Sequence, residues 1–171
     1  MALSNGVVTT FPTLTVLTVN TSNHSIRRMN SGSIVELACQ RLIVEFAAAV
    51  DSQQYERLRS LFTANARFAR PTDPDTVIEG IDNIVAAFKS RPTTRVTQHF
   101  CTNMSITSES ADRARGRCSI LLFSADVAAA ESPGKGRKVG AQLAGTYDDV
   151  YVLTAEGWRI AERCGRVTFH I

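Results

Sequence analysis

The chain has 171 residues and a mass of 18.6 kDa, which fits a single domain because domains usually comprise roughly 100–200 residues. Hydrophobic residues make up 44% and charged residues 20%, a balance typical of globular proteins, and the net charge of +3 is too small to indicate nucleic-acid binding. No apolar run approaches the ~18–20 residues of a membrane span. The composition therefore excludes fibrous proteins, transmembrane helices and disulfide-stapled miniproteins, and we expect neither nucleic acid nor membrane as a partner.

The four cysteines do not have the spacing of a metal centre or a redox site. Cys39, Cys101, Cys118 and Cys164 are far apart and form no C-x-x-C pair, although zinc and dithiol sites need closely spaced thiols. Cysteines in apolar surroundings are commonly buried, so we expect four reduced thiols, which suits a cytoplasmic location. We expect no metal and no cofactor.

The first 32 residues differ from the rest in composition. They are rich in Thr, Ser and Asn, and no Lys or Arg precedes Arg27, which argues against a signal peptide. We interpret residues 1–32 as a disordered or loosely attached leader and residues 33–171 as the folded domain. Met29 is an alternative to Met1 as the natural start.

Two helices are predicted next along the chain. Ser33 and Glu36 have the spacing of a capping box, which indicates a helix start. Apolar residues then recur at helical spacing over about 17 residues, until Asp51 and Ser52 interrupt the pattern. A shorter second helix is expected to bury Tyr55, Leu58, Leu61 and Phe62.

The remaining pattern predicts an α+β domain. A short strand is expected over 62–70, a turn over 71–75 because of its prolines and aspartates, and a third helix from Gly80 to Arg91-Pro92. Four long strands are predicted over 95–107, 113–123, 139–153 and 158–169, with a flexible connection at 133–136. Three helices followed by such strands favour helices packed on one face of a strongly curved, mostly antiparallel sheet.

An ordered set of short motifs adds a family resemblance. The resemblance extends from about Ile34 to Phe169. The motifs that carry it, in order, are residues 51–66, the helix at Gly80, residues 95–100, Asn103, residues 114–116 and residues 157–160. Together they resemble SnoaL-like proteins of the nuclear transport factor 2-like superfamily, above all the scytalone dehydratase branch. The resemblance implies a cone-shaped α+β barrel, in which a bent sheet wraps around helices and encloses a pocket.

The resemblance also implies two acid–base residues. The family's aspartate falls on Asp51 and its histidine on His99, and in related dehydratases and dehydrochlorinases this pair faces the pocket. Other family positions depart from the pattern, because its substrate-binding tyrosine is Val50 here and its second histidine falls near Cys118. A serine and an asparagine of the family fall on Gly145 and Tyr147, and the long C-terminal helix is missing. Scytalone itself is therefore not the expected substrate.

Each of the two residues also has a simpler interpretation. Asp51 could cap the second helix, for which aspartate is among the best residues. His99 could be a half-buried strand histidine with a satisfied hydrogen bond. A histidine is nevertheless well suited to moving protons near neutral pH, and an adjacent carboxylate would orient it.

Further pocket residues can only be named as candidates. Tyr147 and Arg117 could supply a hydroxyl donor and a clamp for an anion or carbonyl. Tyr55, Phe68 and Phe88 could contact substrate, although these three and Trp158 fit an apolar core better. Arg113, Arg115 and Arg117 alternate along one strand, which is typical of a solvated sheet face.

The leading hypothesis is a cofactor-free enzyme that acts on a small apolar or aromatic molecule of polyketide or terpenoid type. The expected reaction is dehydration, followed by isomerisation or cyclisation as the next choices, with His99 as base and acid and Asp51 as its partner. The alternative is a non-catalytic ligand-binding protein or structural subunit, like the small chain of ring-hydroxylating dioxygenases. A transport-factor-like interaction module is a third option. The resemblance implies a homodimer, with a homotrimer as the alternative.

Overall fold

The computed structural model describes residues 31–129 and 131–170. Its helical elements are α1 (Ser31–Asp51), the 3-10 helix η1 (Tyr55–Ser60) and α2 (Ile81–Lys89). Its strands are β1 (Phe62–Arg70), β2 (Asp73–Glu79), β3 (Arg95–Ser108), β4 (Arg113–Asp126), β5 (Glu131–Ser132), β6 (Gly136–Arg137), β7 (Ala141–Thr154) and β8 (Gly157–His170).

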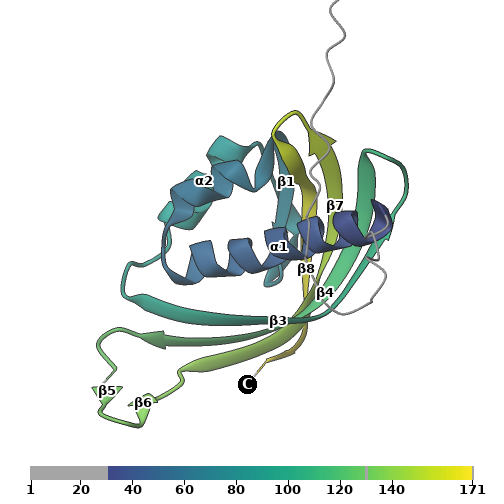
Figure 1. Ribbon diagram of the computed structural model, residues 1–171. Coiled ribbons are helices and arrows are strands. Elements are labelled where there is room, and N and C mark those ends of the chain that lie inside the picture. The colour runs from purple at the N-terminus through teal and green to yellow at the C-terminus, as the bar shows by residue number, and fades with distance from the viewer. Residues whose placement is uncertain (1–30, 130, 171) are drawn as a thin grey trace, which may run out of the picture.

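Six strands form one curved, open sheet in the order β2-β1-β8-β7-β4-β3, and β5 and β6 pair separately as a small hairpin. All neighbours in the large sheet are antiparallel except β1 and β8, which are parallel. β3 carries a bulge between Thr102 and Ser105, where Asn103 adopts a positive φ of 51°, and bulges bend a strand and increase its twist. Figure 1 shows α1 across the concave side of the sheet, with β3 and β4 curving beneath it. This is the mixed α+β, cone-like architecture expected from the sequence.

The core lies between the helices and the concave face of the sheet. One side of α1 is buried because its apolar residues recur at helical spacing, whereas Ile34, Leu37 and Val44 on its other side are exposed. Phe46 is the central side chain, since its ring lies 5.8–6.1 Å from four other aromatic rings. Those rings belong to Phe62, Phe68, Phe88 and Tyr147. The helices and the sheet are thereby joined by one aromatic cluster.

Several local predictions need correction. The second helix is a 3-10 helix of six residues, and α1 begins at Ser31, so that Ser33 lies inside the helix and not at its cap. The turn predicted over 71–75 overlaps strand β2, which begins at Asp73. Pro74 is tolerated there because β2 is an edge strand, where a missing N–H need not break the ladder.

All four cysteines are free, with Cys39 and Cys118 buried and Cys101 and Cys164 half-buried. Residues 1–30 of the predicted leader lie outside the described part of the chain. In that described part, no helix is long and apolar enough to cross a membrane.

Candidate active site

Asp51 and His99 are in direct contact, although 48 positions separate them in the chain. The Asp51 Oδ1 atom lies 2.6 Å from Nδ1 of the His99 ring, and the backbone N–H of His99 donates to Oδ2 at 2.7 Å. The hydroxyl of Thr97 donates to Oδ1 at 2.8 Å. The Asp51 carboxylate is therefore bound to the inner face of β3 and does not cap η1, whose N-cap is Gln54.

The end of α1 places Asp51 in this position. Asp51 is the last residue of α1, and Gln53 turns the chain with a positive φ of 56°. The Gln53 amide then donates to the carbonyl oxygens of Thr93 and Arg95, at 3.2 and 3.0 Å, where β3 begins. These two hydrogen bonds hold the end of α1 against the beginning of β3, next to the Asp51 carboxylate.

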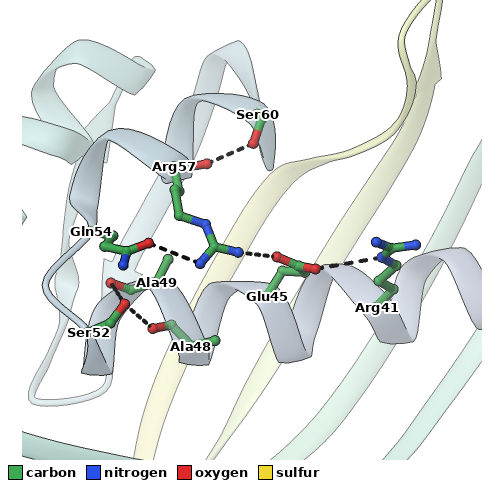
Figure 2. A network of polar contacts seen from close by, with 8 residues as sticks. All are labelled: Arg41, Glu45, Ala48, Ala49, Ser52, Gln54, Arg57 and Ser60. Atoms are coloured by element: carbon green, nitrogen blue, oxygen red, sulfur yellow. Dashed lines mark hydrogen bonds and ion pairs between the residues drawn. The ribbon is translucent and has the colours of Figure 1, made fainter.

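A network of polar contacts holds the same helix end against η1 (Figure 2). The Arg57 guanidinium donates to the Glu45 carboxylate at 2.5 Å and to the side-chain oxygen of Gln54 at 3.2 Å. The Ser52 hydroxyl donates to the Ala48 carbonyl oxygen at 2.7 Å. These bonds lie on the exposed side of α1 and fix the turn that follows Asp51.

The contact between the two side chains keeps Asp51 ionised. Burial pushes the pKa of Asp51 upward, but hydrogen bonds from the His99 ring, the His99 backbone and Thr97 outweigh it, so the pKa lies below its ordinary value. The His99 side chain is only 7% exposed and that of Asp51 21%. A carboxylate on Nδ1 favours the tautomer in which Nδ1 carries the proton and Nε2 is free to accept one. Within the described part of the chain, nothing hydrogen-bonds Nε2.

A second polar pair lies on the same concave face, and the sequence reasoning missed it. Arg163 on β8 donates to both carboxylate oxygens of Asp149 on β7, at 2.8 and 2.7 Å, and both side chains are fully buried. The Tyr151 hydroxyl donates to Asp149 at 2.7 Å. Burial alone would lower the pKa of Arg163, but the Asp149 charge raises it, so Arg163 stays charged.

Alternation along β7 is the signal that could have revealed this pair. Tyr147, Asp149 and Tyr151 stand two residues apart and are all buried, so a charge at Asp149 must face the core. The register then places Arg163 directly opposite Asp149.

The Arg163 guanidinium packs against two aromatic rings, and one of its N–H donors has no hydrogen-bond partner in the described part of the chain. Its guanidinium carbon lies 4.4 Å from the centre of the Phe46 ring and 4.7 Å from that of Tyr147. Its Nη1 atom is buried and has no hydrogen-bond partner in the described part of the chain. Cys101 lies two positions after His99 on β3. The pKa of its thiol is lowered, first by a hydrogen bond with Cys118 and also by the positive charge of Arg163. Arg163 therefore faces the same interior as the Asp51–His99 pair.

Two surface hollows lie near these groups. The larger, about 560 Å³, opens beside the end of α1. It is lined by Gln53, Gln54, Tyr55, Glu56, Arg57, Lys89 and Thr93. The smaller, about 300 Å³, lies over the ends of β3 and β4 and includes Thr97. Neither hollow is lined by Asp51 or His99.

The other candidate residues occupy three kinds of position. Tyr55 lines the larger hollow, and its ring lies 5.7 Å from that of Phe88. Phe68 and Phe88 are each 1% exposed and lie in the aromatic core. Tyr147 faces the same interior, and burial raises the pKa of its hydroxyl.

Arg117 corrects the sequence-based expectation, because it faces away from the interior. It forms a two-pronged ion pair with Asp148 on the exposed face of the sheet, at 2.6 and 2.9 Å. Its neighbour Cys118 points inward instead, since successive residues of a strand face opposite sides. Arg113 and Arg115 pair with Glu109, as expected of a solvated stripe. In the described part of the chain, no three His, Cys, Asp or Glu side chains gather as a metal ion would require.

Several solved structures share this fold. A scytalone dehydratase-like protein from Novosphingobium aromaticivorans is 23% identical with a TM-score of 0.67, over 81% of this chain and 88% of that one. The hexachlorocyclohexane dehydrochlorinase LinA-type3 from Novosphingobium barchaimii LL02 is 20% identical with a TM-score of 0.67, over 81% and 90%. An aromatic ring hydroxylase-like protein from Novosphingobium aromaticivorans is 20% identical with a TM-score of 0.62, over 78% and 89%. At these identities the likeness establishes the fold alone.

The family assignment comes from the sequence match. The model of the SnoaL-like domain matches residues 34–164, which span α1 to most of β8. No curated protein shows a significant match. The chain therefore belongs to the SnoaL-like domain family of the nuclear transport factor 2-like superfamily.

Proposed function

We propose that the protein is an acid–base enzyme that eliminates water from, or isomerises, a small apolar or aromatic molecule. The observation that supports it best is the Asp51–His99 contact at 2.6 Å on the concave face of the sheet. A histidine held by a carboxylate is a general base with a defined tautomer, and such groups typically contribute about 10²–10⁴-fold to rate. Structural neighbours that include a dehydrochlorinase and a dehydratase-like protein make elimination the first reaction to test.

The proposed reaction is the loss of water from a β-hydroxy carbonyl compound. His99 Nε2 removes the proton from the carbon next to the carbonyl, and the electron pair of that C–H bond forms the new C=C bond. The C–O bond on the neighbouring carbon breaks, and its oxygen takes the proton back from the imidazolium and leaves as water. Asp51 stabilises the imidazolium between the two transfers, and the free Nη1 of Arg163 is suited to stabilise the developing oxyanion.

The filled interior gives one observation in favour of the alternative. Neither described hollow is lined by Asp51 or His99, and the His99 side chain is almost completely buried. A substrate must therefore displace side chains before it reaches Nε2. A protein in which they never move apart would be a structural or ligand-binding member of the family.

The test is a turnover screen with paired histidine variants. Aromatic β-hydroxy ketones are incubated with the full chain, and the conjugated enone product is followed by its ultraviolet absorbance. We expect turnover by the wild type, a loss of at least about 100-fold in His99→Gln, and unchanged turnover in His170→Gln, which alters an exposed histidine of β8. Equal turnover by His99→Gln and wild type would contradict the assignment, and binding without turnover would favour the alternative.

We also propose that the convex face of the sheet pairs with a second copy of the chain. The register aligns Phe100, Leu121, Ala144 and Phe169 in one row across β3, β4, β7 and β8. Phe169 is 69% exposed and Phe100 47%, and an aligned apolar row of this kind is typical of an interaction surface. We call these four residues the outer apolar row.

A further inference from the structure

Arg70 and Arg91 differ from most of the other arginines in having no acidic partner. Most described arginines have a carboxylate within 4.0 Å, namely Arg41, Arg57, Arg59, Arg67, Arg113, Arg115, Arg117, Arg137 and Arg163. Arg70 and Arg91 have none in the described part of the chain, although both are half-buried. An arginine taken out of water without an anion is costly, because desolvation penalises its charge.

The two guanidinium groups also act on each other. Burial lowers the pKa of Arg91, and the nearby positive charge of Arg70 lowers it further. Arg70 donates from Nη2 to the Ala87 carbonyl oxygen at 2.8 Å, but its Nε is buried without any partner in the described part of the chain. Two like charges and an unused buried donor therefore lie together at the junction of β1 and α2.

Aromatic rings surround this junction. The Arg91 guanidinium carbon lies 4.1 Å from the centre of the Phe88 ring, and Phe88 contacts Tyr55 at 5.7 Å. The Tyr147 and Tyr55 hydroxyls both lie close enough to act on the Arg91 charge. Tyr55 also lines the hollow, so the aromatic ring of a ligand could stack on its side chain.

The junction also lies between the larger hollow and the interior. Lys89 and Thr93, which flank Arg91 in the chain, both line the hollow beside Tyr55. On the inner side, Pro71 follows Arg70 and packs directly on Gly165, where a Cβ atom would lie 2.4 Å from the proline ring. Gly165 is paired with Tyr147, whose ring lies beside Arg163. Arg91 thus lies in the chain between two residues of the hollow, and Arg70 lies next to the residue that packs on the strand carrying Arg163.

We propose that Arg91 and Arg70 form a subsite for the carboxylate of an aromatic acid, which is the substrate class of this protein. Arg91 and the free Nε of Arg70 donate to the carboxylate, and Tyr55, which lines the hollow, contacts its ring. This inference rests on the proposed function, because it concerns the substrate on which the Asp51–His99 pair acts. It explains why two half-buried arginines lack an acidic partner of their own.

Binding measurements test the subsite independently of catalysis. Naphthalene-2-carboxylate and its neutral analogue naphthalene-2-carboxamide are titrated calorimetrically into the full chain, with inorganic phosphate as a third probe. We expect the carboxylate to bind roughly 10–100-fold more tightly than the carboxamide, since hydrogen bonds to a charged group are worth that factor. Phosphate should bind much more weakly than the carboxylate, because it lacks the ring.

Matched variants locate the effect. Arg91→Met should abolish the preference for the carboxylate, Arg91→Lys should retain part of it, and Arg70→Met should reduce it. Arg166→Met, which removes an equal charge from an exposed position on β8, should leave the preference unchanged. Thermal melting of each variant verifies that it is folded, and Arg91→Met suffices if Arg70→Met does not fold.

Three results would overturn the subsite. They are failure of the carboxylate to bind wild type more tightly than the carboxamide, an unchanged preference in Arg91→Met, and phosphate binding as tight as that of the aromatic acid. His99→Gln separates this proposal from the proposed function, because it should keep the carboxylate preference. If His99→Gln retains both the preference and full turnover, the subsite stands and the acid–base assignment fails.

Discussion

Two neighbouring aspartates on β7 form the same kind of ion pair on opposite faces of the sheet. Asp148 pairs with Arg117 on the convex face, where the two side chains are 38% and 65% exposed. Asp149 pairs with Arg163 on the concave face, where both are completely buried. The geometry is equally good in both, with two charge-assisted hydrogen bonds each.

The two pairs differ in what the loss of one partner leaves behind. On the convex face water replaces a lost partner, so an exposed pair is typically worth about 0–1 kcal/mol. On the concave face no water reaches the remaining charge, and breaking a buried pair typically costs about 3–5 kcal/mol. Unpaired polar groups on the concave face thus carry a large free-energy cost, and this is also the face that holds the Asp51–His99 pair. The convex face carries the outer apolar row.

The largest expected effect is on the buried pair. Asp149→Asn should lower the free energy of unfolding by about 3–5 kcal/mol, because Arg163 remains charged without a counter-ion. Urea unfolding of the full chain measures it, with Asp148→Asn as the matched control that should change stability by about 1 kcal/mol or less. Equal losses in the two variants would contradict the contrast between the faces.

Replacing both members of the buried pair should have a smaller effect on stability than removing one. The double variant Asp149→Leu with Arg163→Met should recover most of the loss, because buried pairs can often be replaced by apolar side chains of similar volume at little cost. Part of the loss should remain, since Tyr151 loses its acceptor. The proposed turnover should nevertheless fall, as Arg163 would be gone. A double variant as unstable as Asp149→Asn would show that packing, and not the unpaired charge, causes the loss.

The acid dependence of stability should depend on Asp51. Its pKa is lowered in the folded state, so its contribution is present above the unfolded value of about 3.9 and is lost as the pH falls through the folded value. Asp51→Asn should therefore be less stable than wild type at pH 7, and the difference should shrink below about pH 4. Unfolding curves from pH 2 to 7 measure this, and a difference that is constant with pH would contradict it.

The smallest effect on stability is expected on the convex face, where the readout is association. Phe169→Glu places a charge in the outer apolar row and should shift the chain towards the monomer in sedimentation velocity, with little change in secondary structure. Val77→Glu is the control, because Val77 is an exposed apolar residue on the edge strand β2. Unchanged association in Phe169→Glu would exclude this face as the interface.

Much of the architecture follows from local patterns. Helical spacing of apolar residues predicts α1 and α2, and the long strands lie within a few residues of their predicted bounds. The edge strand β2 was not predicted, because two prolines and two aspartates in 71–75 indicate a turn. Its partner β1 supplies the ladder that overrides this signal. A pairing between strands cannot be read from either strand alone.

The candidate site divides in the same way. The family resemblance indicates Asp51 and His99, and alternation along β7 is enough to place Asp149 inward once Tyr147 is known to be buried. The sequence leaves two interpretations of Arg117 open, a pocket clamp or part of a solvated sheet face, because strand parity depends on one buried neighbour, which here is Cys118. The structure supports the solvated face. No local signal identifies Arg163, Arg70 or Arg91, since each is one arginine among many until its partners are known.

The sequence by itself determines the family, the order of helices and strands, and the residue types that could move a proton. Only the tertiary structure decides that Asp51 meets His99, that one of two adjacent aspartates is buried with an arginine, and that Arg70 and Arg91 are half-buried without an anion. The physical reason is that apolar periodicity is a local property of the chain. Charge pairing and desolvation depend on neighbours far away in sequence, and these neighbours are set only when the curved sheet packs around α1.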